Sequence, residues 1–229
     1  MNTLRNKLFY GVAICVLVMG ASSPAVPVVT VDGYVAMGGM RLNTTNEYLL
    51  IGYPESAPVQ AGPMLMQTWG FAFIGFDNLP NQLVAQAALT LQSIPQTSGM
   101  WPAPEDSPVN VELYASAIDL SQFTVGQVDG VRQTMIANSP AAMTVVSGGE
   151  GFYQWDVTDM LNDWILGGGS VPFGIFLASD GGAIPKFHSS ETTTGTGPAL
   201  SYTVVPEPAT LAMLGLGVVG LLSRRNRRS

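Results

Sequence analysis

The strongest constraint on the fold is a run of alternating side chains at residues 84–94, VAQAALTLQSI. Leu89 and Leu91 fall on one side of the alternation, and Thr90 and Gln92 fall on the other. Because successive side chains of a β-strand point to opposite faces of the sheet, this pattern predicts a half-exposed strand. One face of its sheet should be buried and the other should meet solvent.

Short segments of the same kind recur along the chain, separated by Gly, Pro, Asn and Ser. Residues 69–76 alternate large and small side chains, which predicts a central strand with one closely covered face. Residues 121–139 are ambiguous and fit a helical turn and a strand. Roughly eight to ten strands predict an all-β fold, a jelly-roll-like antiparallel β-sandwich with one short helix. The expected strands are residues 33–37, 47–53, 69–76, 84–94, 109–116, 141–146, 152–157, 172–179, 186–190 and 199–204.

The one short helix is expected after residue 157. Apolar residues recur three and four positions apart from Val157 to Ile165, which is one helical stripe. Thr158 is placed to cap the helix N-terminus, and the glycines at 167–169 should end the helix. Trp155 and Trp164 are both expected to turn into the core.

Residues 1–25 have the order of a secretory signal peptide. Basic residues precede an apolar run from Leu8 to Met19, and small residues follow it. We expect signal peptidase to cut between Ala21 and Ala25. The single cysteine, Cys15, lies within this segment, so the body after cleavage has no thiol.

The last 24 residues, 206–229, have three parts in strict order: a Pro-Glu-Pro triplet, an apolar run and a basic end. The apolar run, residues 209–222, would form a helix about 21 Å long, which is shorter than the ~30 Å hydrocarbon core of a bilayer. Arginines resist translocation and should hold the end of the chain in the cytoplasm. The residues that carry this signal are Pro206, Glu207, Pro208, Arg224, Arg225, Arg227 and Arg228.

This order of triplet, apolar run and basic end resembles the PEP-CTERM sorting signal. The resemblance implies processing by an exosortase, a transpeptidase of bacteria with exopolysaccharide envelopes. The chain would then be exported across the inner membrane, held there for a time by its C-terminal hydrophobic helix, and delivered to the envelope or the extracellular matrix. A plain tail anchor is the alternative. The expected domains are a signal peptide at 1–25, a sandwich at 26–205 and a sorting signal at 206–229.

The charge of the expected body excludes one class of partner. Residues 26–205 contain 3 basic and 15 acidic residues, so their net charge is −12, compared with −7 for the whole chain. Such a body repels polyanions, which argues against nucleic acid. It also argues against binding an acidic polysaccharide by charge alone, unless divalent cations bridge the two.

Several segments of the body resemble the DNRLRE-type module of secreted proteins. They are FYQWDVTDMLNDWILGG at 152–168, the strand and turn at 75–91, FHSSE at 187–191 and the closing strand at 198–204. The resemblance implies a jelly-roll sandwich with a link to polysaccharide binding. One departure is Ser190, which stands where the family has a basic residue, and this puts an ion pair with Glu191 in doubt.

The chain has no convincing catalytic constellation. His188 is its single histidine, and a single histidine with no cysteine is more often a plain strand residue than a general base or metal ligand. Asp156, Asp159 and Asp163 are interpreted as a helix start and a solvated face. We expect no catalytic residues, no metal ligands and no cofactor, although Ca²⁺ stays open. A polysaccharide-degrading enzyme on the same scaffold is the alternative function.

Sugar binding would need exposed aromatic rings, because pyranose rings stack on them. Trp101, in a proline-rich loop, is the first candidate, and Trp69 and Tyr34 are the next. For Trp101 the alternative is a loop residue folded onto the edge of the sandwich. The sequence therefore predicts an exported, non-catalytic protein associated with exopolysaccharide or biofilm.

Overall fold

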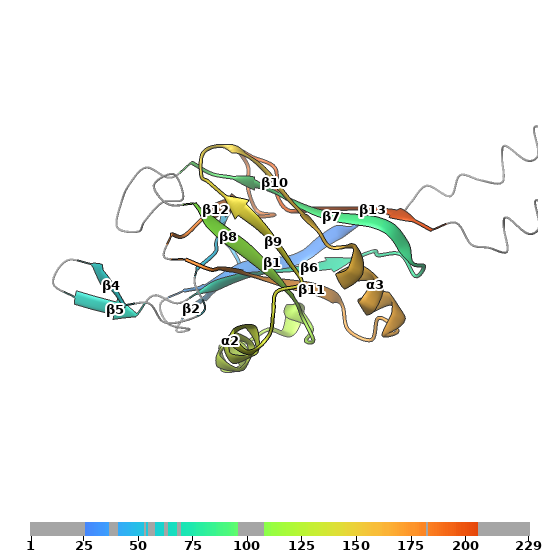
Figure 1. Ribbon diagram of the computed structural model, residues 1–229, viewed down its shortest axis with the longest axis horizontal. Helices are drawn as coiled ribbons and strands as arrows, with labels where there is room; N and C mark the ends of the chain where they lie inside the picture. The colour runs from blue at the N-terminus through green and yellow to red at the C-terminus, as the bar shows by residue number, and fades with distance from the viewer. Residues whose placement is uncertain are drawn as a thin grey trace, which may run out of the picture.

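The computed structural model describes residues 26–36, 41–52, 54, 58–61, 64–67, 70–95, 108–181 and 183–205. Two antiparallel sheets pack against each other, and α2 (Val128–Ala137) lies on the outer side of the larger one (Figure 1). The elements, in chain order, are β1 (Val28–Ala36), β2 (Arg41–Asn43), β3 (Tyr48–Leu50), β4 (Pro58–Ala61), β5 (Met64–Gln67), β6 (Phe71–Asp77), β7 (Val84–Ser93), β8 (Val109–Ala115), the 3-10 turns η1 (Leu120–Gln122) and η2 (Val125–Gln127), α2 (Val128–Ala137), β9 (Ala142–Val146), β10 (Gly151–Asp156), α3 (Thr158–Leu166), β11 (Phe173–Ser179), β12 (Lys186–His188) and β13 (Ala199–Val204).

The larger sheet has six strands in the order β2-β1-β6-β11-β8-β9. The smaller sheet has five: β10, β7, β12 and β3 follow one another, and β13 pairs with the first part of β7. β4 and β5 form a separate hairpin. Between β6 and β12 the chain changes sheet at nearly every connection, so the two sheets are tied together along their length. The predicted all-β antiparallel sandwich is confirmed.

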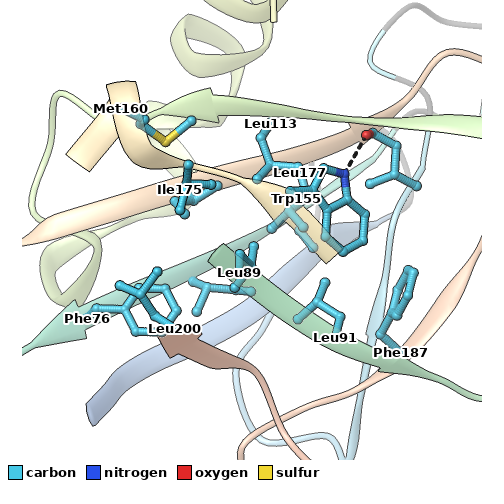
Figure 2. Packing of buried hydrophobic residues seen from close by; sticks show 14 of the residues in the cluster. Phe76, Leu89, Leu91, Leu113, Trp155, Met160, Ile175, Leu177, Phe187 and Leu200 are labelled. Carbon is cyan, nitrogen blue, oxygen red and sulfur yellow. Dashed lines mark hydrogen bonds between the residues drawn. The ribbon is translucent and has the colours of Figure 1, made fainter. Parts of the chain in front are cut away.

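The main core fills the space between the two sheets (Figure 2). At its centre the Trp155 side chain, 1% exposed, donates its indole N–H to the carbonyl of Val111 at 2.9 Å. Trp155 also packs edge-to-face with Phe187, and their ring centroids are 6.1 Å apart. A buried indole must find an acceptor for its N–H, and here a strand of the opposite sheet supplies it. The inward direction predicted for Trp155 is confirmed, and Trp164 packs half-buried against the same core.

Strand β6 is buried on both faces, which differs from the single covered face expected for residues 69–76. Ala72 and Ile74 enter the main core, while Phe71 and Phe73 point the other way into a second apolar cluster. Alternation therefore separated the two sets of side chains correctly. It could not show that a further layer covers the second set.

That further layer comes from the segment whose structure the sequence left ambiguous. Residues 121–139 contain no strand; they form the end of η1, then η2 and α2. Phe123 packs against Phe71 and Phe73 with ring centroids 6.2 and 5.2 Å apart, and Met135 of α2 is buried in the same cluster. The expectation of a single helix was wrong, because α2 is present as well as α3. The apolar stripe of α2 is short, with Val128 and Met135 buried and Val131 half-buried, and polar residues separate them.

Helix α3 has the predicted apolar stripe, which packs into the main core. The predicted cap at Thr158 was wrong. Thr158 is the first helical residue, and Asp156 Oδ1 accepts its backbone N–H at 2.9 Å, while the Thr158 hydroxyl accepts the N–H of Ala87 in β7 at 2.8 Å. The helix ends at Gly167 as predicted, and Gly168 follows with φ 83°, a conformation that glycine adopts without strain.

The terminal segments predicted to form signal helices, 1–25 and 206–229, lie outside the described residues. Within the part of the chain that the structure describes, no helix has the length and apolar character needed to cross a membrane. The predicted domain limits stay predictions.

Candidate functional site

The C-terminal end of the sandwich places the sorting signal directly after the last strand pairing. β13 runs antiparallel to β7 as far as the Val204–Val84 pair, and the Val205 N–H then donates to the Leu83 carbonyl at 2.8 Å. Pro206 is the next residue. The last backbone pairing that the structure describes therefore lies one residue before the Pro-Glu-Pro triplet.

The face of the smaller sheet that points away from the core carries amide and hydroxyl side chains. Alternation along β7 places Gln86 and Thr90 on this side, opposite Thr203 of β13 and Gln154 of β10. Both glutamine side chains are exposed. Among the described residues, no protein group forms a hydrogen bond with the side-chain amides of Gln86 and Gln154. Both side-chain amides are therefore available to a ligand.

A shallow depression of about 160 Å³ lies in this face. Next to it, Phe152 of β10 is paired with Gln92 and is 63% exposed. The side-chain Oε1 of Gln92 already accepts the backbone N–H of Thr196 at 2.6 Å. We call this surface the amide face; the residues that line its depression are Gln86, Ala88, Gln154, Ser201, Tyr202 and Thr203.

Of the predicted aromatic candidates, Trp101 and Trp69 lie outside the described residues. Tyr34 is only 6% exposed and stacks on Tyr48 with ring centroids 5.9 Å apart. Its hydroxyl accepts a hydrogen bond from the Asn46 side chain at 2.7 Å. The Tyr34 ring thus has no free flat face for a sugar. Phe152 is an exposed aromatic residue that the sequence argument did not select.

His188 lies on β12 and is held by its neighbours. Its Nδ1 lies 2.8 Å from the Thr192 hydroxyl, and Gly195 packs so closely on the ring that a Cβ there would lie 2.3 Å from Nε2. Any side chain at position 195 would meet the imidazole, so the ring or the loop would have to shift. Both ring nitrogens therefore face protein groups.

The three aspartates near α3 do not converge. Asp156 accepts the hydroxyl and backbone N–H of Thr158, and these bonds lower the pKa of its carboxyl group. Asp159 and Asp163 lie on the exposed side of the helix. Within the described residues, no three His, Cys, Asp or Glu side chains are placed together to bind a metal ion.

Asp32, a buried carboxyl group in β1, was not among the predicted site residues. Asp32 is 1% exposed, and Ser190 donates to it through its backbone N–H at 2.7 Å and its hydroxyl at 3.0 Å. Burial, helped by the nearby Glu191, raises the pKa of Asp32 to about 7 against the lowering effect of the Ser190 bonds. Its signal in the sequence is an acid inside the apolar run Val29–Ala36.

A comparison with protein families matches residues 204–228 to the PEP-CTERM protein-sorting motif. The match covers the predicted triplet, the apolar run and the arginines, and it indicates an exported chain that an exosortase processes. No curated protein matches the chain. The family comparison gives no support to the DNRLRE-type resemblance of the body.

Proposed function

We propose that this protein is a non-catalytic component of the exopolysaccharide or biofilm matrix, which its sandwich joins by weak binding to a neutral glycan. The sorting motif at 204–228 supports export and release, because it begins at the last residue of β13 and its Pro-Glu-Pro triplet follows two residues later. Export to a polysaccharide-rich envelope brings the body into contact with glycans.

The amide face is the observation that carries glycan binding. Side-chain amides both donate and accept hydrogen bonds, as sugar hydroxyls do, and Gln86 and Gln154 offer them without a competing protein partner among the described residues. Phe152 adds an exposed apolar ring beside the depression, on which the C–H face of a pyranose can stack. The DNRLRE-type resemblance of residues 152–168 agrees with this proposal.

The charge of the body determines which glycan is expected. A net charge of −12 opposes uronate-rich polymers unless Ca²⁺ bridges the two, so a neutral polysaccharide is the preferred ligand. No cofactor is required for this mode of binding. The held position of His188 and the separated aspartates likewise favour binding over hydrolysis.

The test is affinity electrophoresis of the folded protein through gels containing a neutral β-glucan or alginate, with and without Ca²⁺. We expect retardation in the neutral gel and at least a tenfold loss of affinity in the double variant Gln86→Ala, Gln154→Ala. Gln133→Ala, an exposed glutamine on α2 at the other side of the sandwich, is the matched control and should bind normally.

Trp101→Ala is measured in parallel, because this residue was the first aromatic candidate from sequence. Failure of the wild-type protein to bind any of these polymers would reject glycan binding and leave a structural role. Normal binding by the double glutamine variant would reject the amide face as the site.

A further inference from the structure

Both ends of the described body are fastened to one turn of the sandwich. The turn at residues 78–83 connects β6 to β7, and the Asn78 side chain donates to the Val26 carbonyl at 2.8 Å. At the other end of the same turn, the Leu83 carbonyl accepts the N–H of Val205. The two ends of the described body, Val26 and Val205, therefore lie at the same end of the sandwich.

This end carries a group of exposed apolar side chains. Val28 pairs with Asp77 beside the turn, Val204 pairs with Val84, and β1 lies in contact with β13, so the two chain ends are neighbours. Clustered exposed apolar residues mark an interaction surface, whereas single ones are ordinary. We call this group the base patch: Val26 (73% exposed), Val28 (53%), Leu83 (42%), Val204 (39%) and Val205 (43%).

The length of the following segment limits how far the base patch can lie from a membrane. Only residues 206–208 separate Val205 from the apolar run that begins at Ala209. Three residues span at most about 11 Å even when fully extended, at ~3.3–3.6 Å each. With the apolar run inserted in a bilayer, the end of the sandwich from which the tail leaves must remain at the membrane surface.

We propose that, before processing, the base patch rests on the lipid bilayer and orients the sandwich upright on the membrane. This proposal rests on the proposed membrane retention of the unprocessed tail. We expect this contact to be apolar rather than electrostatic. Within the described strands, the one charged residue that pairs with a member of the patch is Asp77, an acid opposite Val28. The basic residues of the described body, Arg41, Arg132 and Lys186, belong to other parts of the fold. Upright docking holds the Pro-Glu-Pro triplet at the bilayer surface, where a membrane-bound processing enzyme can reach it.

The body lacks cysteine, which permits labelling at single sites. Leu83→Cys places an environment-sensitive fluorophore in the base patch. Ser147→Cys is the matched control, because Ser147 is exposed in the turn that leads to Gly151, and Gly151 pairs with Ser93 at the far end of β7. The ten residues of β7 separate the two ends by about 30 Å. Both variants also carry Cys15→Ser.

The labelled, unprocessed full chains are purified from the membranes of exosortase-deficient cells and reconstituted into phosphatidylcholine–phosphatidylglycerol vesicles. Both should float with the vesicles. Brominated lipid should quench the label at position 83 at least twofold more than the label at position 147. This difference should persist in about 0.5 M salt, where the Debye length is roughly 4 Å and attraction between charges is screened.

Equal quenching at the two positions in chains that float would overturn the docking proposal while leaving membrane retention intact. Chains that do not float would overturn membrane retention, and docking with it. If the Leu83→Cys protein is misfolded by circular dichroism, Val28→Cys replaces it as the label site in the same patch.

Discussion

At the scale of single residues, Asp32 is the side chain with the most unusual environment. It is buried in a sheet, its hydrogen-bond donors come from Ser190, and Glu191 faces it as a second acid. Ser190 is uncharged and supplies no positive charge to offset the burial of Asp32. The carboxyl group thus lies beside a neutral partner, and its pKa rises to about 7.

This pKa predicts a fall in stability with rising pH. The unfolded Asp32 loses its proton near pH 3.8 and the folded one near 7, so the folded protein binds more protons between these values. Its stabilising effect is complete below about pH 4 and disappears as the pH rises through about 7. Asp32→Asn should reduce the difference in free energy of unfolding between pH 5 and pH 8 by about 2–3 kcal/mol.

Urea unfolding at the two pH values measures this difference. Glu191→Gln is the partial control, because it removes the neighbouring acid but leaves the burial of Asp32 unchanged. An Asp32→Asn protein with the wild-type pH profile would show that Asp32 does not control it.

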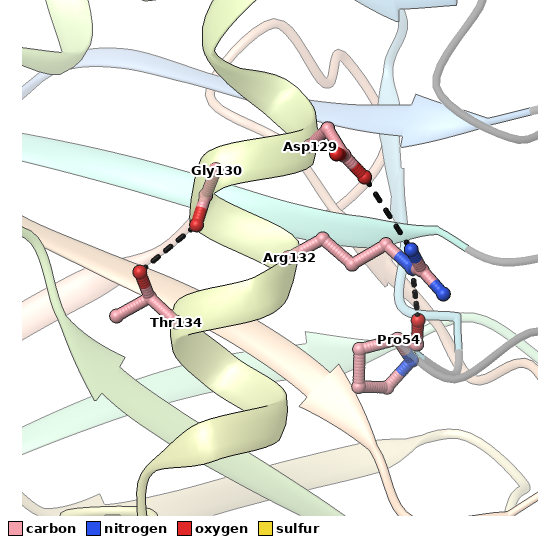
Figure 3. Close-up of polar contacts among 5 residues, drawn as sticks. All are labelled: Pro54, Asp129, Gly130, Arg132 and Thr134. Atoms are coloured by element: carbon pink, nitrogen blue, oxygen red, sulfur yellow. Dashed lines mark hydrogen bonds and ion pairs between the residues drawn. The ribbon is translucent and has the colours of Figure 1, made fainter.

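At the scale of secondary structure, Arg132 adds a polar contact between α2 and a distant loop to the apolar packing of that helix. Arg132 donates from Nε to the carbonyl of Pro54 at 2.7 Å, and its guanidinium group also lies 3.4 Å from Asp129 (Figure 3). The Arg132 side chain is 17% exposed, whereas that of Asp129 is 76% exposed. The bond to Pro54 therefore lies in a more protected site than the ion pair.

Arg132→Ala should lower the free energy of unfolding by about 1–3 kcal/mol, because it removes a charged hydrogen bond and the packing of the alkyl stem. Asp129→Ala removes only an exposed ion pair and should cost less than about 1 kcal/mol. Urea titration of the two variants at pH 7 compares them directly. Equal losses in both would show that the Pro54 contact contributes nothing beyond the pair.

At the scale of the whole molecule, two features matter: the packing of the layers on one another and the position of the last strand beside the sorting motif. β6 is shared by both apolar clusters, so the α2 layer and the two sheets stabilise one another. The last strand of this body ends at Val204, and the matched sorting motif begins at that residue. Processing at the triplet would therefore release the sandwich with every strand that the structure describes.

We predict that cells with exosortase release most of the protein without residues 206–229, and that cells lacking the enzyme keep it intact in the membrane fraction. Replacing Pro206, Glu207 and Pro208 by alanine should reproduce the exosortase-deficient result in normal cells, whereas Thr203→Ala should be processed. Mass spectrometry of each fraction gives the C-terminus. An intact chain ending at Ser229 in the final location would instead support the plain tail anchor.

The sequence by itself determined the features that depend on neighbouring residues. The strands β7 and β8, the inward direction of Trp155 and the stripe of α3 followed from alternation and helical spacing. The sorting signal also followed, because its triplet, apolar run and arginines are contiguous. In each case the residues that carry the pattern lie within one short segment of the chain.

Tertiary structure alone decided the features that join distant segments. Packing against Phe71 and Phe73 placed the α2 layer, the carbonyl of Val111 satisfied Trp155, and Ser190 enclosed Asp32 from 158 positions away. The amide face and the base patch arose in the same way, from strand register and shared turns. Local pattern specifies which side chains share a face, but only the folded arrangement specifies what covers that face.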